Sequence, residues 1–492
     1  MAIPPLRARV SLAPADRKYH TISFFALTKH YRSMPCFFNL FRLPTKLRIP
    51  LHGTCALALV LLSGTLGAQD LTVPLLSDSW QATFSNPALY GQAKGDFTIG
   101  LPGISNDLYA ENVTYNELLL NENGRRVLDL NRLPGLLADR NELRDDFSVE
   151  TLGVGMRGDR FSLGLYHRLR ASGQADYPKT LAQLVVQGNA QFVGQTIEFA
   201  PLIFGTTYHE IGLGTSVAIT DNIHFGARIK YLSGIADVRT GASASLQLTT
   251  GEENFALTLD QDLTLNTAGT VDYNGLDDVG INYDFNRIET DDIFSGNNGV
   301  AFDFGLFATF GKVRLQAAAN DLGGTINWAN DVTSFRLQGS DEFSGLDILA
   351  QVLEDSLSFT AALDSLQLAF EPAEDNSPYD GKLASTYLIG GEFDVTDRLT
   401  AGLIVVHYDR PLSSETAFAL SARYRIIEQL TVGLNYNARK NAAANFGAHV
   451  YAHLGPVNLI ASTDNLLTVF RQKDSSRAGV RLGASLSLGG ED

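Results

Sequence analysis

The residues with the clearest capacity for chemistry are histidines in strongly alternating segments. His224, His449 and His453 share the polar face of their segments. A histidine next to a serine and an orienting polar group would form a hydrolytic triad. The sequence contains no G-x-S-x-G elbow or other paired motif. We therefore predict no catalytic residues and no enzyme, and keep a membrane-embedded hydrolase as a remote alternative.

Metal chemistry has equally little support. Cys36 and Cys55 are the only cysteines, which excludes a disulfide framework and a cysteine-based zinc site. Asp272, Asp277 and Asp278 cluster as in calcium loops, but the loop pattern fails at its third ligand. We expect a solvated acidic loop, no metal and no cofactor.

Cationic side chains also follow the polar faces of alternating segments. A charge that faces lipid at mid-bilayer costs about 2–4 kcal/mol, so these side chains must point into a lumen or lie at a rim. We favour ion-paired struts across a barrel over a path for an anionic solute. The predicted lumen-lining residues are Arg228, Lys230, Arg423, Arg425, His449, His453 and Arg481.

Alternation with a period of two positions these side chains on strands. In 223–231, Phe225, Ala227 and Ile229 alternate with Gly226 and Arg228, as in a half-buried strand. Sixteen candidate strands occur, and fourteen is as plausible a number because boundaries err by about 2–4 residues. Two of these candidates are 240–250 and 253–264.

A membrane barrel satisfies this pattern. Tight breaks such as 158–159 and 220–222 separate some segments, and long acidic stretches at 265–299 and 320–383 separate others. Short turns at one rim and long loops at the other are typical of outer-membrane barrels. We predict an all-β, transmembrane, up-and-down antiparallel barrel of 14–16 strands. A secreted sandwich or propeller would need a recurrent blade motif, which the sequence lacks.

Three stretches favour short helices that lie in the lumen or cap the barrel: 125–144, 178–193 and 343–357. None is long enough to span a membrane.

The N-terminus has the features of a secretory signal. Lys46 and Arg48 precede the apolar run 55–62, and small residues follow up to Ala68. We predict a signal peptide over 1–68, with Met34 as an alternative start, and a barrel over 69–492 whose segment 69–93 plugs or caps it. The chain carries 54 acidic and 38 basic residues, a net charge of −16, which makes nucleic acid an unsuitable partner.

Short motifs in order along the chain resemble one known family, the Bacteroidetes outer-membrane barrels known only as a domain of unknown function. These motifs are Ser85-Asn-Pro-Ala88, 101–105, 188–190, Tyr208-His209-Glu210, 228–234 and 462–465. The resemblance implies an outer-membrane barrel over essentially the whole chain after the signal.

The tripeptide Asn86-Pro87-Ala88 is also similar to one in long-chain fatty-acid transporter barrels, whose N-terminal segment forms a luminal hatch. Asn before Pro equally favours a simple turn. We expect passive transport of a small or hydrophobic solute across the outer membrane. A non-transporting scaffold for a secretion, gliding or adhesion assembly is the alternative. The expected partners are outer-membrane lipid, a small-molecule solute and proteins at the long loops.

Overall fold

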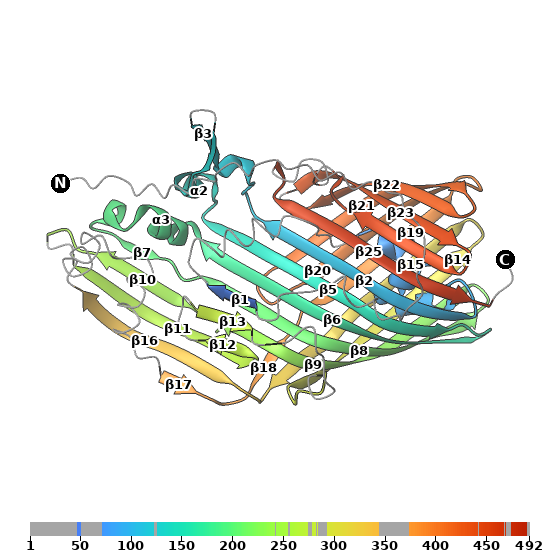
Figure 1. Ribbon diagram of the computed structural model, residues 1–492, viewed down its shortest axis with the longest axis horizontal. Coiled ribbons are helices and arrows are strands. Elements are labelled where there is room, and N and C mark those ends of the chain that lie inside the picture. Colours follow the sequence, from blue (N-terminus) through green and yellow to red (C-terminus); the bar gives the residue numbers. More distant parts are fainter. Residues whose placement is uncertain are drawn as a thin grey trace, which may run out of the picture.

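The computed structural model shows a closed antiparallel barrel with a sheet and short helices beyond one end (Figure 1). It describes residues 47–50, 71–122, 125–241, 243–253, 256–273, 278–281, 283, 293–343, 373–440, 442–466, 468 and 474–489.

Fourteen of the described strands form the barrel. Each pairs with the next in chain order, and the last pairs with the first from Phe97↔Leu488 to Tyr109↔Arg477. This closes the sheet and confirms the predicted fold. The strands are β2 (Phe97–Ala110), β5 (Arg140–Met156), β6 (Phe161–Pro178), β8 (Leu202–Thr220), β9 (Ile223–Thr240), β14 (Asn298–Phe310), β15 (Val313–Trp328), β19 (Ser385–Asp394), β20 (Leu399–Asp409), β21 (Ser414–Ile427), β22 (Leu430–Arg439), β23 (Ala442–Leu454), β24 (Val457–Thr463) and β25 (Arg477–Leu488).

The two faces of the barrel wall differ as the alternation predicts. On β21, Phe418 and Leu420 are exposed on the outer face, whereas Ala419 and Ser421 are buried inside. Large apolar side chains form a belt around the outer surface, while most buried charged side chains lie in the lumen. Exposed members of the belt include Leu152, Leu163, Leu165, Leu213, Ile229, Phe304, Leu306, Leu315, Ile389, Leu403, Leu434, Phe446, Leu459 and Leu482.

The two rims also differ. At one rim, here the turn rim, six connections are two to four residues long: 157–160, 221–222, 311–312, 395–398, 428–429 and 455–456. At the other, here the loop rim, the longest connections are 111–139, 179–201, 241–297 and 329–384. The predicted asymmetry is therefore present.

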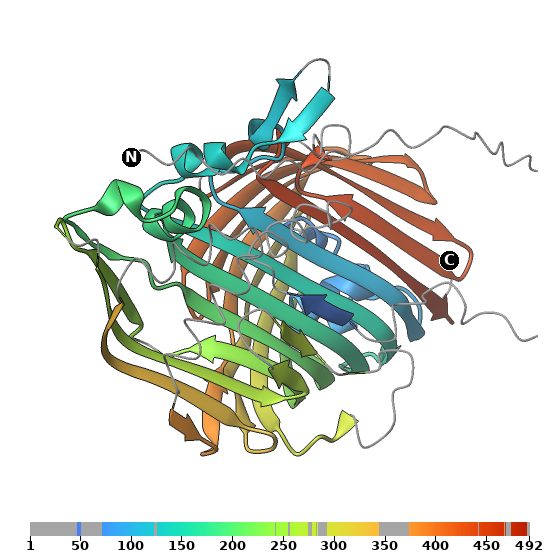
Figure 2. The same ribbon diagram turned by 60° about the vertical axis from the view of Figure 1, so that its left-hand side comes forward.

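A sheet extends the wall beyond the loop rim (Figures 1 and 2). β9 pairs with β14 up to Ser233 and then with β11 (Leu257–Gly269) from Ala236. The candidate strands 240–250 and 253–264 belong to this sheet and not to the barrel, because they pair with each other, with rim strands and with the part of β9 that extends beyond the barrel. Besides β11, the rim strands are β7 (Thr196–Glu198), β10 (Ser245–Thr250), β16 (Thr333–Phe343), β17 (Ala373–Asp375) and β18 (Tyr379–Lys382).

The remaining described elements are short. One sheet is formed by β1 (Leu47–Pro50), β12 (Val271–Tyr273) and β13 (Asp278–Ile281), and another by β3 (Leu119–Glu122) and β4 (Arg125–Leu128). The 3-10 helices outside the lumen are η4 (Asn116–Leu118), η5 (Leu130–Arg132) and η6 (Ala190–Phe192).

Of the three predicted helical stretches, the structure contradicts one and contains a helix in another. The helix over 125–144 is wrong: β4, the single-turn α2 (Leu133–Leu136) and the start of β5 occupy it, since Pro134-Gly135 prevents a longer helix. α3 (Lys179–Gln187) lies within the second predicted stretch. The third, 343–357, lies almost wholly outside the described residues. Among the described helices, none has the length and apolarity needed to cross a membrane.

Candidate solute site in the barrel lumen

Residues 71–93, here called the plug, lie inside the barrel (Figure 2). The plug contains three 3-10 helices: η1 (Val73–Leu75), η2 (Trp80–Phe84) and η3 (Pro87–Gly91). Ser79 caps η2 by accepting a hydrogen bond from Ala82 N, and Asn86 caps η3 by accepting one from Ala88 N. Such local caps suit Ser and Asn, whose short side chains bond the nearby backbone.

The tripeptide Asn86-Pro87-Ala88 forms a turn that presses against the wall. Asn86 Nδ2 donates to Leu306 O at 3.1 Å and to Gln316 Oε1 at 3.3 Å. A Cβ atom at Gly226 would collide with the backbone of Pro87 and Ala88, and one at Gly305 would collide with Asn86. These two glycines therefore create the space in which the turn lies.

Aromatic side chains fill the plug's other contact with the wall. The rings of Trp80 and Phe84 meet edge to face at 5.9 Å, and Phe84 meets Tyr166 of β6 in the same way at 4.8 Å. Trp80 lies over Gly100, Gly153 and Gly155, which face it from β2 and β5. Edge-to-face pairs add about 0.5–1.5 kcal/mol each beyond burial, so this cluster stabilises the plug inside the lumen.

Wall side chains also donate hydrogen bonds to plug carbonyl groups. Six such hydrogen bonds connect the plug to strands around the barrel, and three of them come from the predicted lumen residues Arg228 and Arg423. The contacts are Arg228 to Thr83 O and Phe84 O (2.9 and 2.8 Å), Gln316 to Pro74 O (2.8 Å), Asn320 to Ser85 O (2.8 Å), Arg423 to Leu75 O (2.6 Å) and Ser216 to Ala88 O (2.9 Å).

Buried ion pairs continue from these contacts along the lumen. Arg228 lies 2.5 Å from Asp303, Lys230 lies 2.8 Å from Asp303, and Lys230 lies 2.7 Å from Asp321. Arg170 joins Asp321 to Glu210, which also pairs with Arg168 at 2.5 Å. Every carboxylate in this network meets at least two cations, which offsets the cost of burying charge.

A second network near the loop rim was not predicted from the sequence. Asp107 and Glu415 both pair with Arg144 and Arg477, at 3.0–3.3 Å. The signal was present in the alternation, because Asp107 on β2 and Glu415 on β21 occupy inward positions of their strands. The predicted lumen residues include neither these two acids nor Arg144 and Arg477, which pair with them.

The other predicted lumen residues occupy different depths. Arg481 is buried and donates to Glu150 at 2.8 Å. His449 is 1% exposed, and both ring nitrogens lack a hydrogen-bond partner among the described residues, although Ser462 is its cross-strand neighbour. His453 contacts Asn458 near the turn rim. Arg425 is exposed near the turn-rim end of β21, which is the rim position that the prediction gave as the alternative to the lumen.

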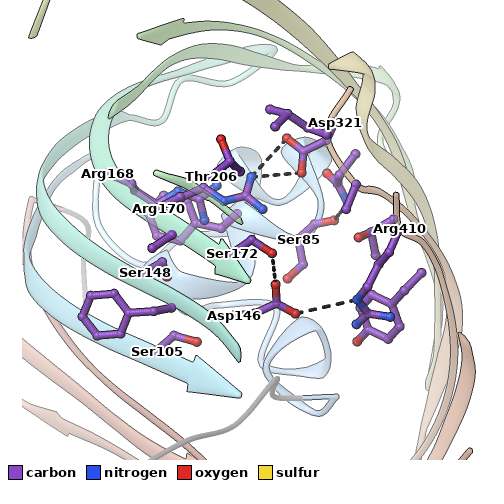
Figure 3. A pocket seen from close by; sticks show the side chains of 18 of the residues that line it. Ser85, Ser105, Asp146, Ser148, Arg168, Arg170, Ser172, Thr206, Asp321 and Arg410 are labelled. Atoms are coloured by element: carbon purple, nitrogen blue, oxygen red, sulfur yellow. Dashed lines mark hydrogen bonds and ion pairs between the residues drawn. The ribbon is translucent and has the colours of Figure 1, made fainter. Parts of the chain in front are cut away.

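The plug separates two cavities. The loop-side cavity, of about 200 Å³, is bounded below by Pro74, Phe84 and Ser85 of the plug. The turn-side cavity, of about 310 Å³, lies between Gly91 and the β5–β6 turn. Figure 3 shows the loop-side cavity, with Arg168, Arg170, Ser172 and Thr206 on one side and Arg410 opposite.

The described residues contain no group of three or more His, Cys, Asp or Glu side chains placed to hold a metal ion. The acidic loop considered for calcium falls largely outside the part of the chain that the structure describes. What the lumen offers is a polar site of hydroxyl and guanidinium groups, suited to binding a solute through hydrogen bonds and charge.

Comparison with solved structures finds other barrels. The toluene transporter TbuX of Ralstonia pickettii is 11% identical, with a TM-score of 0.39, covering 83% of this chain and 93% of that one. The toluene transporter TodX of P. putida is 11% identical, with a TM-score of 0.37 and coverage of 83% and 94%. A FadL homologue of Pseudomonas aeruginosa is 12% identical, with a TM-score of 0.34 and coverage of 83% and 91%.

Comparison with curated protein sequences returns no match. A family profile does match, over residues 87–464, and its description is "Family of unknown function (DUF5723)". The match spans most of the barrel, from the plug's Pro87 to Asp464 after β24. It confirms the resemblance to a barrel family of unknown function, and the chain is a member of the DUF5723 family.

Proposed function

We propose that this protein is an outer-membrane barrel that admits a small polar solute, with the plug as its hatch. One observation carries the proposal: a folded segment of the same chain lies between two polar cavities inside a closed barrel. A barrel that served only as an anchor would need no such arrangement.

The outer surface supports a membrane location. Leu213, Phe304 and Leu434 are about half exposed or more, at 54%, 44% and 63%, and they belong to a belt that runs around the barrel. In water such a surface would be unfavourable by about 25 cal/mol per Å². In lipid it is favourable, and closure of the sheet satisfies the backbone hydrogen bonds of the wall.

The contacts that hold the plug are consistent with its movement away from the wall. The wall's strand ladder closes through β2 and β25, so it would remain intact if the plug moved. The plug is held by hydrogen bonds to its carbonyl groups and by the contacts of Trp80, Phe84 and Tyr90. A single hydrogen bond contributes about 0.5–1.5 kcal/mol net, because water replaces it on release.

The cavity lining favours a polar solute over the hydrophobic one that the sequence left open. Ser105, Ser148, Ser172, Thr206 and Thr386 line the loop-side cavity together with five cationic side chains and two carboxylates. An apolar solute there would remove these groups from water without replacing their hydrogen bonds.

Solute flux into liposomes tests the proposal. We would replace Cys36 and Cys55 by Ser and introduce a cysteine pair by Ala88→Cys and Ser216→Cys, at positions where plug and wall are joined by a 2.9 Å hydrogen bond. Once mass spectrometry verifies the cross-link, the reduced protein should admit small polar solutes and the oxidised protein should not. Equal flux in both states would contradict the hatch. No flux in either the reduced variant or the wild type would contradict transport.

The scaffold alternative has one observation in its favour. The rim sheet of β7, β10, β11, β16 and β17 extends beyond the barrel wall, where it would be accessible to a protein partner. If this function holds, removing the hairpin of β10 and β11 should abolish partner capture and leave flux unchanged. Under the hatch proposal, by contrast, changes to the plug should alter flux and leave partner capture unchanged.

A further inference from the structure

The loop-side cavity has an unusual arrangement of hydrogen-bond donors on two neighbouring strands. Arg168, Arg170 and Ser172 are alternate residues of β6 and face the lumen. Across the ladder they pair with Glu210, Tyr208 and Thr206 of β8. This register places two guanidinium groups and two hydroxyl groups on one patch of wall (Figure 3).

Several of these donors have no acceptor among the residues that the structure describes. Arg168 binds Glu210 through Nε and Nη2, which leaves Nη1. Arg170 binds Glu210 and Asp321 through Nη1, which leaves Nε and Nη2. The Thr206 hydroxyl makes no hydrogen bond within the described residues although Thr206 is only 4% exposed. Buried polar groups rarely stay without partners, so this patch calls for a ligand.

The carboxylates of the cavity are already occupied. Asp321 accepts from Arg170 and from Lys230. Asp146 accepts from Ser172 at 2.5 Å and lies 3.5 Å from Arg144 and 3.7 Å from Arg410. Because guanidinium groups only donate, the groups left over on this patch are donors, and the ligand that matches them carries acceptors.

The fully buried acids lie behind the cations. Glu210 and Asp303 are not exposed at all, and neither lines the cavity, whereas Arg168, Arg170 and Lys230 do. A ligand in the cavity therefore meets the cations before Glu210 and Asp303. Asp321 also lines the cavity, but Arg170 and Lys230 already neutralise it. Charge-assisted hydrogen bonds from arginine to a carboxylate are about twice as strong as neutral ones, which favours an anionic acceptor over a neutral one.

Aromatic side chains and size define the rest of the ligand. Phe84, Phe204 and Tyr208 line the same cavity, and Arg168 lies 4.6 Å from the Phe84 ring centroid. An apolar cavity of about 150 Å³ accommodates benzene. The 200 Å³ here therefore suits a single ring with one small substituent.

We propose that the loop-side cavity is a binding site for a small ring-bearing carboxylate. Arg168, Arg170 and Thr206 bind the carboxylate, and Phe84, Phe204 and Tyr208 contact the ring. The site rests on the proposed function for its role, which is to hold the solute above the closed plug, but its binding is measurable without transport.

Calorimetry on the full chain in detergent tests this with three probes of similar size: benzoate, benzylammonium and benzyl alcohol. Benzoate should bind with one-to-one stoichiometry, and at least tenfold more tightly than either of the others. Binding of benzylammonium as tight as that of benzoate, or no binding of benzoate, would overturn the proposal.

Two variants connect the signal to this patch. Thr206→Val removes the unpartnered hydroxyl with little change of shape and should weaken benzoate binding by about tenfold, the loss expected for a hydrogen bond to a charged group. Arg170→Gln should weaken it further. Thr207→Val, at the next residue on the opposite face of β8, should bind benzoate like the wild type. Unchanged binding in Thr206→Val and Arg170→Gln would overturn the assignment.

Binding and flux separate the two proposals. Benzoate binding without flux through either plug state would leave the site intact and contradict the transport proposal. Flux of polar solutes without benzoate binding would contradict the proposed carboxylate site but would not contradict the proposed hatch.

Discussion

The guanidinium of Arg228 lies 2.5 Å from the carboxylate of Asp303, and neither side chain is exposed. The same guanidinium donates to the carbonyl oxygens of Thr83 and Phe84. One ion pair therefore connects β9 and β14 of the wall to the plug. It is therefore one contact through which changes in the wall would reach the hatch.

Asp303→Asn should destabilise the protein strongly. The change keeps the side-chain shape but removes the negative charge that neutralises the buried Arg228 and Lys230. Breaking a buried ion pair costs about 3–5 kcal/mol. Urea unfolding in detergent would measure the free energy of unfolding. Asp380→Asn, in an exposed contact with Asn327, is the control and should change it by less than about 1 kcal/mol. A loss no larger than the control's would show that the pair is not a structural contact.

Gly226→Val should open the barrel. Its side chain would collide with the backbone of Pro87 and Ala88, so the plug must shift from the wall. We expect a higher single-channel conductance in planar bilayers, and faster flux of polar solutes. Gly173→Val, at a position where an added Cβ meets nothing within 4 Å, should conduct like the wild type. Equal conductance in the two variants would contradict the idea that the plug closes the lumen.

Leu213→Arg tests the apolar belt. Leu213 is 54% exposed on the outer face of β8, and an arginine facing lipid at mid-bilayer costs about 2–4 kcal/mol. We expect less protein in the membrane fraction and a lower unfolding free energy in lipid vesicles. Asp397→Arg, an exposed change in the β19–β20 turn, should insert normally. Normal insertion and stability of Leu213→Arg would contradict a lipid-facing belt.

Removal of the N-terminal 68 residues stays a prediction. Leu71 N donates to the buried Asp464 carboxylate at 3.0 Å, so the described plug begins within the lumen, three residues after the predicted cleavage site. N-terminal sequencing of protein taken from the membrane fraction should give Gln69 as the first residue. A chain that retains residues before Gln69 would contradict the predicted signal.

The sequence by itself determined the wall of this protein. Period-two alternation depends only on neighbouring residues, so it identified the strands of the barrel wall. It also gave the inward direction of Arg228, Lys230 and Arg481. The plug candidate 69–93 came instead from the similarity of Asn86-Pro87-Ala88 to the tripeptide of fatty-acid transporter barrels. The same local signal did not distinguish β10 and β11 from barrel strands, because a rim strand and a barrel strand alternate alike.

Only the tertiary structure decided what the inward residues meet. The partners of Arg228 are 75 residues later in Asp303 and about 145 residues earlier in the plug, and no local pattern encodes such distances. The unused donors of Arg168 and Arg170 are likewise a tertiary property, because Glu210 and Asp321 on other strands occupy their remaining nitrogens. Barrel closure brings these residues together, because curvature directs alternate side chains of distant strands into one small volume.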